Sequence, residues 1–162
     1  MTAEVEAIIE RLARNPRLLH ATLFPHRHGD ATPAFHLEMI DAWWSTDPHV
    51  GTEAFRGGAK STIAEEAITG MACLRMFKNA IILGDNETRA KERLTSIKHE
   101  LETNEDLIEL FGDLVGDTWT ETKIVLTNGT AYWVEALFKE GTGGDYMEVV
   151  MRAVDQDRKS VV

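Results

Sequence analysis

A glycine-rich run in the first half of the chain carries residue types that suit phosphate binding. Residues 54–61 (AFRGGAKS) follow the spacing G-x-x-x-x-G-K-[ST], with alanine at both positions where that motif has glycine. In such a loop, backbone N–H groups converge on an anion, the lysine reaches the β and γ phosphates, and the hydroxyl binds Mg²⁺. Lys60 and Ser61 keep this order, and the preceding glycines can form the tight turn. The predicted nucleotide-binding residues are Gly57, Gly58, Ala59, Lys60, Ser61 and Thr62.

The alanine at position 59 departs from the motif. Glycine is preferred where the backbone needs a positive φ, so we expect a negative φ at Ala59. The alternative interpretation of this run is an ordinary turn and helix start, in which Ser61 or Thr62 caps the helix and Lys60 is solvated.

The loop is predicted to lie between a strand and a helix. Residues 49–55 (HVGTEAF) are a candidate short buried strand. After Lys60 the apolar residues recur at helical spacing, so the loop should open directly into a helix. Residues 79–84 (NAIILG) form an apolar run typical of a strand buried on both faces of a parallel sheet. We therefore expect the order strand, loop, helix, strand.

Helical patterns flank this region. Residues 2–15 predict one amphipathic helix that Pro16 ends. Residues 17–34 suggest a short helix followed by an irregular loop, and a further helix should begin at Pro33. Residues 87–111 keep their apolar side chains roughly on one stripe and predict a single long helix.

The remaining strand signals lie near the C-terminus. Residues 123–126 (KIVL) and 131–137 (AYWVEAL) flank an Asn-Gly pair at 128–129, which is the strongest hairpin signal in the chain. The alternation of strands with helices predicts an α/β fold with a mainly parallel central sheet flanked by helices.

Composition restricts the function classes. The chain has 162 residues, of which 43% are hydrophobic, and a net charge of −10, which repels nucleic acid on average. Any contact with DNA must therefore be local or made elsewhere. The single cysteine cannot form an internal disulfide, and no run suits a membrane span or signal peptide. We expect a cytoplasmic protein without a membrane partner.

Several stretches resemble the ATPase domain of the phage terminase large subunit. They are FHLEMI (35–40), AFRGGAKST (54–62), the run from AIILGDNETRAKERL to ELFG (80–112) and WTETKIVLTNGT (119–130). The resemblance covers about residues 24–137. It implies a P-loop NTPase fold of the ASCE type, and a viral DNA-packaging motor that hydrolyses ATP to drive double-stranded DNA into a procapsid. It also implies that a nuclease domain is joined to the ATPase domain and that the protein acts in the host cytoplasm. The implied partners are the portal, the small terminase subunit and further copies of the same chain in a homo-oligomer.

The same resemblance assigns roles to individual residues. Lys60 would hold the β and γ phosphates, Ser61 would bind Mg²⁺, and the three residues before Lys60 would supply cradling amides. Arg56 stands where terminases often carry a basic residue that senses or stabilises the γ-phosphate, so it is the candidate catalytic residue. Phe35 and His36 are weaker candidates for approaching the adenine, since an aromatic residue at a helix start usually belongs to the core.

Phosphoryl transfer also needs a carboxylate on the metal and a following glutamate that activates water. No apolar run ending in Asp-Glu or Asp-Asp is present, and the nearest match ends at Asp85. We therefore interpret the chain as a fragment: an N-terminal helical segment (1–48), a partial ATPase core (49–137) and a divergent or artefactual tail (138–162). The last six residues resemble a translated sequencing adapter. On this interpretation the isolated chain has no turnover.

Three alternatives remain. The first is another P-loop ATPase such as a helicase, whose further motifs would follow downstream. The second is a module that binds nucleotide without turnover. The third is a metallohydrolase, because residues 26–30 (HRHGD) offer two imidazoles and a carboxylate that suit zinc.

Overall fold

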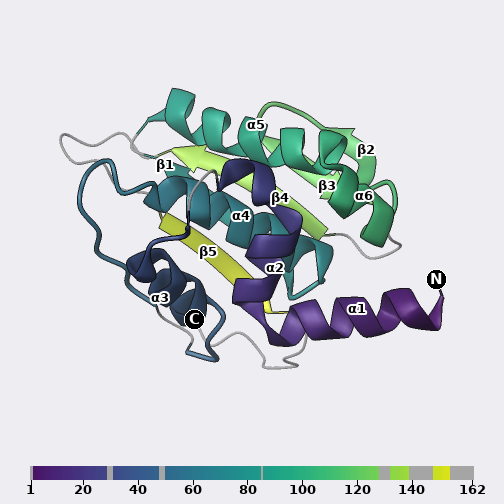
Figure 1. Cartoon of the computed structure of the whole chain (residues 1–162). Coiled ribbons are helices and arrows are strands. Elements are labelled where there is room, and N and C mark those ends of the chain that lie inside the picture. The colour runs from purple at the N-terminus through teal and green to yellow at the C-terminus, as the bar shows by residue number, and fades with distance from the viewer. Residues whose placement is uncertain are drawn as a thin grey trace.

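The computed structural model describes residues 2–28, 31–47, 50–84, 86–127, 132–138 and 148–153 (Figure 1). The helices in these ranges are α1 (Ala3–Arg14), α2 (Pro16–Leu23), the 3-10 helix η1 (Pro25–Arg27), α3 (Ala34–Trp43), α4 (Lys60–Cys73), α5 (Glu87–Thr103) and α6 (Glu105–Phe111). The strands are β1 (Phe77–Gly84), β2 (Val115–Trp119), β3 (Lys123–Leu126), β4 (Tyr132–Phe138) and β5 (Glu148–Ala153).

The first helix begins and ends where the sequence predicts, whereas α3 begins one residue later than predicted, because Pro33 is its N-cap residue and not its first helical residue. Thr2 caps α1, and its Oγ1 accepts a hydrogen bond from the amide of Val5 at 3.4 Å. Asn15 ends α1 and caps α2, and Pro16 occupies the first turn of α2, where the missing N–H costs nothing. The predicted helix over 2–15 is confirmed.

The predicted long helix over 87–111 is wrong in one respect, because Asn104 divides it into α5 and α6. The Asn104 Oδ1 accepts from the amide of Leu107 at 3.2 Å, and its Nδ2 donates to the carbonyl of Leu23 at 2.6 Å. A side chain that bonds to the backbone in this way caps a new helix instead of continuing the old one.

The sheet is mixed, with strand order β2-β3-β4-β1-β5. Only β1 and β4 are parallel, whereas β1–β5, β2–β3 and β3–β4 are antiparallel. The predicted P-loop NTPase fold with a mainly parallel central sheet is therefore wrong, and within the described ranges helices account for more residues than strands. For β3 and β4 the reason is the length of the connection: only five residues separate them, which permits antiparallel pairing, while parallel pairing needs a crossover of a dozen residues or more. The hairpin pairing of β3 with β4 is confirmed, but the turn residues 128–130 lie outside the described residues.

The predicted strand before the glycine-rich loop is also wrong. Residues 50–55 have no regular secondary structure, and 49 lies outside the described residues. Both edges of β1 are taken by β4 and β5, so this segment does not extend the sheet beside it. Instead, Trp43 Nε1 donates to Thr52 Oγ1 at 2.8 Å, which holds the segment near the end of α3.

The helices cover the sheet in layers. The α5 helix packs on β1 and β4, α4 packs on α5 and β1, and α2 and α3 pack on α4 (Figure 1). The core between α4, α5 and β1 includes Ile68, Met71, Ile82, Leu94 and Ile97, all nearly fully buried. The α4 helix is therefore enclosed by other elements along most of its length, while its first residues, at Lys60, remain partly exposed. No helix in the described part of the chain combines the length and apolar character needed to cross a membrane.

Candidate functional site

The glycine-rich run forms a turn that leads into the first residue of α4. The amide of Gly58 donates to the carbonyl of Phe55 at 3.2 Å, and Gly57 has a φ of +84°. Lys60 begins a helix of 14 residues. The first amides of a helix have no intrahelical acceptor, and the helix dipole makes this end partly positive. This geometry is suited to an anion.

Among the residues that the structure describes, no side-chain hydrogen bond caps this end of α4. The N-cap residue is Ala59, which has no acceptor atom, and neither Ser61 nor Thr62 occupies the cap position. The alternative in which one of these hydroxyls caps the helix is therefore wrong. Ser61 and Thr62, which carry the hydroxyls of the first turn, are partly buried, as is Lys60. Arg56 and Gly57 are exposed.

The expected negative φ at Ala59 is wrong. Its φ is +51° and its ψ is 20°, in the left-handed region that favours glycine. An L-residue in this conformation is destabilised by about 1–2 kcal/mol, because Cβ crowds the following carbonyl oxygen. The conformation that the motif reserves for glycine is thus present here although the residue is alanine.

Replacing Ala59 by glycine should raise the free energy of unfolding by about 0.5–1 kcal/mol. The relief of left-handed strain exceeds the extra entropy that glycine brings to the unfolded chain. Urea unfolding followed by circular dichroism measures the change. Ala7→Gly, at an exposed position inside α1, is the matched control and should lower stability by about 1 kcal/mol. If both variants lose stability equally, the left-handed conformation at 59 is refuted.

Two aromatic residues of α3 contact the loop. His36 Nε2 lies 2.7 Å from the carbonyl oxygen of Gly58, and because a carbonyl only accepts, Nε2 carries the proton and donates. The centroid of the Phe35 ring lies 5.4 Å from the centroid of the Phe55 ring, directly before the turn. Both residues were weak candidates for contacting adenine. The structure brings them to the loop, where His36 acts as a buried support for its backbone.

The carboxylate needed for turnover is not supplied by the described acids of α4. Glu65 and Glu66 are 3% and 0% exposed and are bonded to basic side chains of other segments. Asp85, the nearest match in the sequence, lies outside the described residues.

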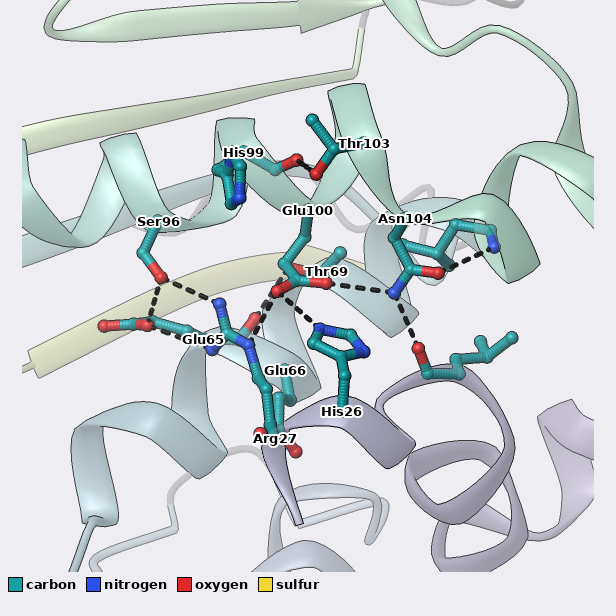
Figure 2. A network of polar contacts seen from close by, with 12 residues as sticks. His26, Arg27, Glu65, Glu66, Thr69, Ser96, His99, Glu100, Thr103 and Asn104 are labelled. Carbon is teal, nitrogen blue, oxygen red and sulfur yellow. Dashed lines mark hydrogen bonds and ion pairs between the residues drawn. The ribbon is translucent and has the colours of Figure 1, made fainter. Parts of the chain in front are cut away.

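Glu65 belongs to a polar network that joins η1 to α4 and α5 (Figure 2). Arg27 donates from Nε to Glu100 at 2.7 Å, from one terminal nitrogen to Glu65 at 3.3 Å, and from the other to Ser96 at 2.9 Å. Arg93 donates to the second oxygen of Glu65 at 2.9 Å. Burial alone would raise the pKa of Glu100, but hydrogen bonds from Asn104, His26 and Arg27 outweigh it and hold that pKa below its usual value. The network is a buried charge cluster that fixes η1 in place.

A second cluster surrounds Glu66, the residue after Glu65 in α4. Glu66 Oε2 is 3.0 Å from His20 Nδ1 and 2.9 Å from His28 Nε2. His20 comes from α2, His28 follows η1, and Glu66 comes from the second turn of α4. The three ligand-type atoms lie within 4.8 Å of one another.

The two histidines of the HRHGD sequence, which suggested a metallohydrolase, contact different glutamates in the structure. His26 turns to Glu100 at 3.1 Å, His28 turns to Glu66, and Asp30 lies outside the described residues. Sequence reasoning missed His20 and Glu66. The sequence did contain one signal, because Glu66 directly precedes the apolar residues Ala67 and Ile68 on a helix that other elements must cover. A carboxylate at such a position needs a buried partner.

Comparisons with known proteins add no family to these observations. No protein-family model matches the chain, and a search of curated proteins finds no match. The similarity to terminases therefore rests on the residues quoted above.

Proposed function

We propose that residues 56–62 and the first turn of α4 bind the polyphosphate end of ATP together with Mg²⁺. The observation that carries this proposal is the uncapped N-terminus of α4, which begins at Lys60 directly after a turn with two left-handed residues. Backbone amides at such a helix start attract phosphate whether or not a strand precedes the loop. The mixed sheet and the missing strand therefore change the fold class but leave this local chemistry intact.

Each residue of the loop has a defined task in this proposal. The Lys60 ammonium contacts the β and γ phosphates, and the Ser61 hydroxyl binds Mg²⁺. The Gly58 amide donates to the Phe55 carbonyl, so the amides of Gly57, Ala59 and the first turn of α4 are the ones that contact the phosphate oxygens. Arg56 is exposed at the outer edge of the turn, where a guanidinium neutralises charge on the γ-phosphate. Thr62, in the first helical turn, offers a second hydroxyl.

The wider function that we propose comes from the similarity to terminases. In this proposal the chain is the N-terminal part of a viral DNA-packaging motor, which hydrolyses ATP to move double-stranded DNA into a procapsid. Its partners are the DNA, the portal, the small terminase subunit and further copies of itself, and it works in the host cytoplasm. The net charge of −10 disfavours a broad DNA-binding face on this chain, so DNA contacts belong to local patches or to other parts of the protein.

The test is a calorimetric titration of Mg·ATP into the purified chain and into Lys60→Ala. We expect saturable binding by the native chain and an affinity about 10- to 100-fold lower in the variant, because a charge-assisted hydrogen bond to phosphate contributes about 1.5–3 kcal/mol. Lys78→Ala, which removes the same charge at an exposed position of β1, is the matched control and should bind as the native chain does. Equal binding by all three proteins would remove Lys60 from the site.

Turnover is a separate expectation. The chain should release no phosphate above background, because no pair of adjacent acids follows an apolar strand in its sequence. Steady hydrolysis that disappears in Lys60→Ala would show that a carboxylate elsewhere in the chain serves the metal.

A further inference from the structure

The environment of Glu66 differs from that of the other buried acids. Glu65 and Glu100 each contact Arg27, whereas the Glu66 carboxylate is fully buried and, among the described residues, contacts only two imidazoles. Both imidazoles approach the same oxygen, Oε2. An ionised carboxylate in the interior needs a compensating positive charge, which a protonated imidazole or a bound cation supplies.

Two polar atoms of this cluster have no hydrogen-bond partner in the described part of the chain. They are Oε1 of Glu66 and Nε2 of His20, whose side chains are 0% and 3% exposed. When only hydrogen bonds hold the cluster, His20 donates from Nδ1 and His28 donates from Nε2 to Oε2 of Glu66. Oε1 then has no hydrogen-bond donor among the described residues. A cation bound to the carboxylate would use the lone pairs of Oε1, whereas Nε2 of His20 has no described partner with or without an ion on Nδ1.

The geometry of the cluster suits a divalent ion. Zn²⁺ binds imidazole nitrogen and carboxylate oxygen at about 2.0–2.2 Å, which places tetrahedral ligands about 3.3 Å apart. The separations of 3.0 and 2.9 Å from Oε2 are close to this value, and all three atoms lie within 4.8 Å of one another. A small outward movement would seat an ion between Nδ1 of His20, Nε2 of His28 and the carboxylate. The second oxygen, Oε1, is then available to complete the coordination.

His28 also has a side-chain partner suited to a ligating imidazole. Its Nδ1 lies 3.5 Å from Thr32 Oγ1. When Nε2 binds a metal, Nδ1 carries the proton, and a hydrogen bond from that nitrogen orients the ring. The His28 side chain is 15% exposed, so an ion can reach the cluster from that side.

We propose that His20, His28 and Glu66 form a structural Zn²⁺ site. The ion joins α2 and the segment after η1 to α4, whose N-terminus carries the proposed phosphate loop about 9 Å away, six residues earlier along the helix. The site is separate from the Mg²⁺ that Ser61 would hold, because imidazole ligands favour zinc over magnesium. It does not depend on nucleotide binding at the loop.

The test loads the metal-stripped 162-residue chain with Zn²⁺ and measures the bound metal after dialysis by mass spectrometry, together with the melting temperature. We expect one zinc per chain and a rise of several degrees, since an ion that binds only the folded state stabilises it. His28→Ala and Glu66→Gln should lose both effects. His99→Ala, which removes an exposed histidine of α5 outside the cluster, should keep both. Circular dichroism establishes that each variant is folded, and Co²⁺ absorption in place of zinc reports tetrahedral coordination in variants of low stability.

Two results would overturn the site. One is a native chain that retains no zinc. The other is zinc that His28→Ala and Glu66→Gln retain as well as the native chain, which would show adventitious binding by surface histidines. Since Lys60→Ala should bind zinc normally, failure of the metal site and failure of the nucleotide site remain distinguishable.

Discussion

Replacing Arg27 by alanine should lower the free energy of unfolding by about 3 kcal/mol. Arg27 is the only arginine in contact with Glu100 among the described residues, and it also contacts Glu65 and Ser96. Removing one partner of a buried ion pair leaves the other charge uncompensated, which typically costs about 3–5 kcal/mol. In the variant, Arg93 still contacts Glu65 and His26 still contacts Glu100. The loss of unfolding free energy should therefore lie at the lower end of that range. Urea unfolding of the native chain and the variant measures it.

The matched control for this substitution is Arg17→Ala. Arg17 forms a bidentate pair with Asp41 between α2 and α3, but both side chains are about half exposed, at 50% and 45%. An exposed pair contributes about 0–1 kcal/mol because water already solvates both charges. Equal losses in the two arginine variants would contradict the view that the network around Arg27 is a buried charge cluster.

The same network predicts a dependence on pH. The pKa of Glu100 in the folded chain is below its ordinary value of 4.5, so the folded state holds the ionised form more strongly than the unfolded state does. This contribution to stability is complete above the unfolded pKa and is lost as the pH falls through the folded pKa. In Arg27→Ala the hydrogen bond and the charge that lower the pKa of Glu100 are removed, while burial still raises it, so this pKa is higher than in the native chain. The variant should therefore begin to lose stability at a higher pH than the native chain when unfolding is measured across a pH series.

A second large effect is expected when Gly116 in β2 is replaced by alanine. A Cβ atom at this position would lie 2.1 Å from the carbonyl oxygen of Val125 and 3.0 Å from its carbonyl carbon. These are backbone atoms of β3, so the clash cannot be relieved by rotating a side chain. The pairing of β2 with β3 must open or shift, and we expect a loss of about 3 kcal/mol, at the upper end of what overpacking costs.

The control is Gly51→Ala, because a Cβ at Gly51 meets nothing within 4 Å and no positive φ is required there. Its stability should change by less than about 0.5 kcal/mol, as for most exposed substitutions. Melting temperatures of the two variants provide the comparison. If Gly116→Ala unfolds at the native temperature, β2 does not approach β3 as closely as described.

The local elements of this chain follow from short stretches of sequence. Thr2 and Asn15 bracket α1, Lys60 begins α4, and the apolar run over 79–84 lies inside β1, because caps, prolines and apolar spacing act within a few residues. The candidate phosphate-binding loop was identified in the same way, since a turn and the helix start that follows it are contiguous. Asn104 marks the limit of this reasoning: it lies in the middle of a helical pattern, and its bond to the distant carbonyl of Leu23 accompanies its role as the cap of α6.

Tertiary structure alone decided how β1 pairs with β4 and β5 and which groups are the partners of the buried charges. The parallel pairing of β1 with β4 and the antiparallel pairing of β5 with β1 join segments far apart along the chain, so no local pattern indicates their direction. The cluster of His20, His28 and Glu66 likewise joins residues up to 46 positions apart, from α2, the segment after η1 and α4. A local pattern shows that a charge will be buried, but the group that compensates it depends on which helices pack together, and that is set by the whole core.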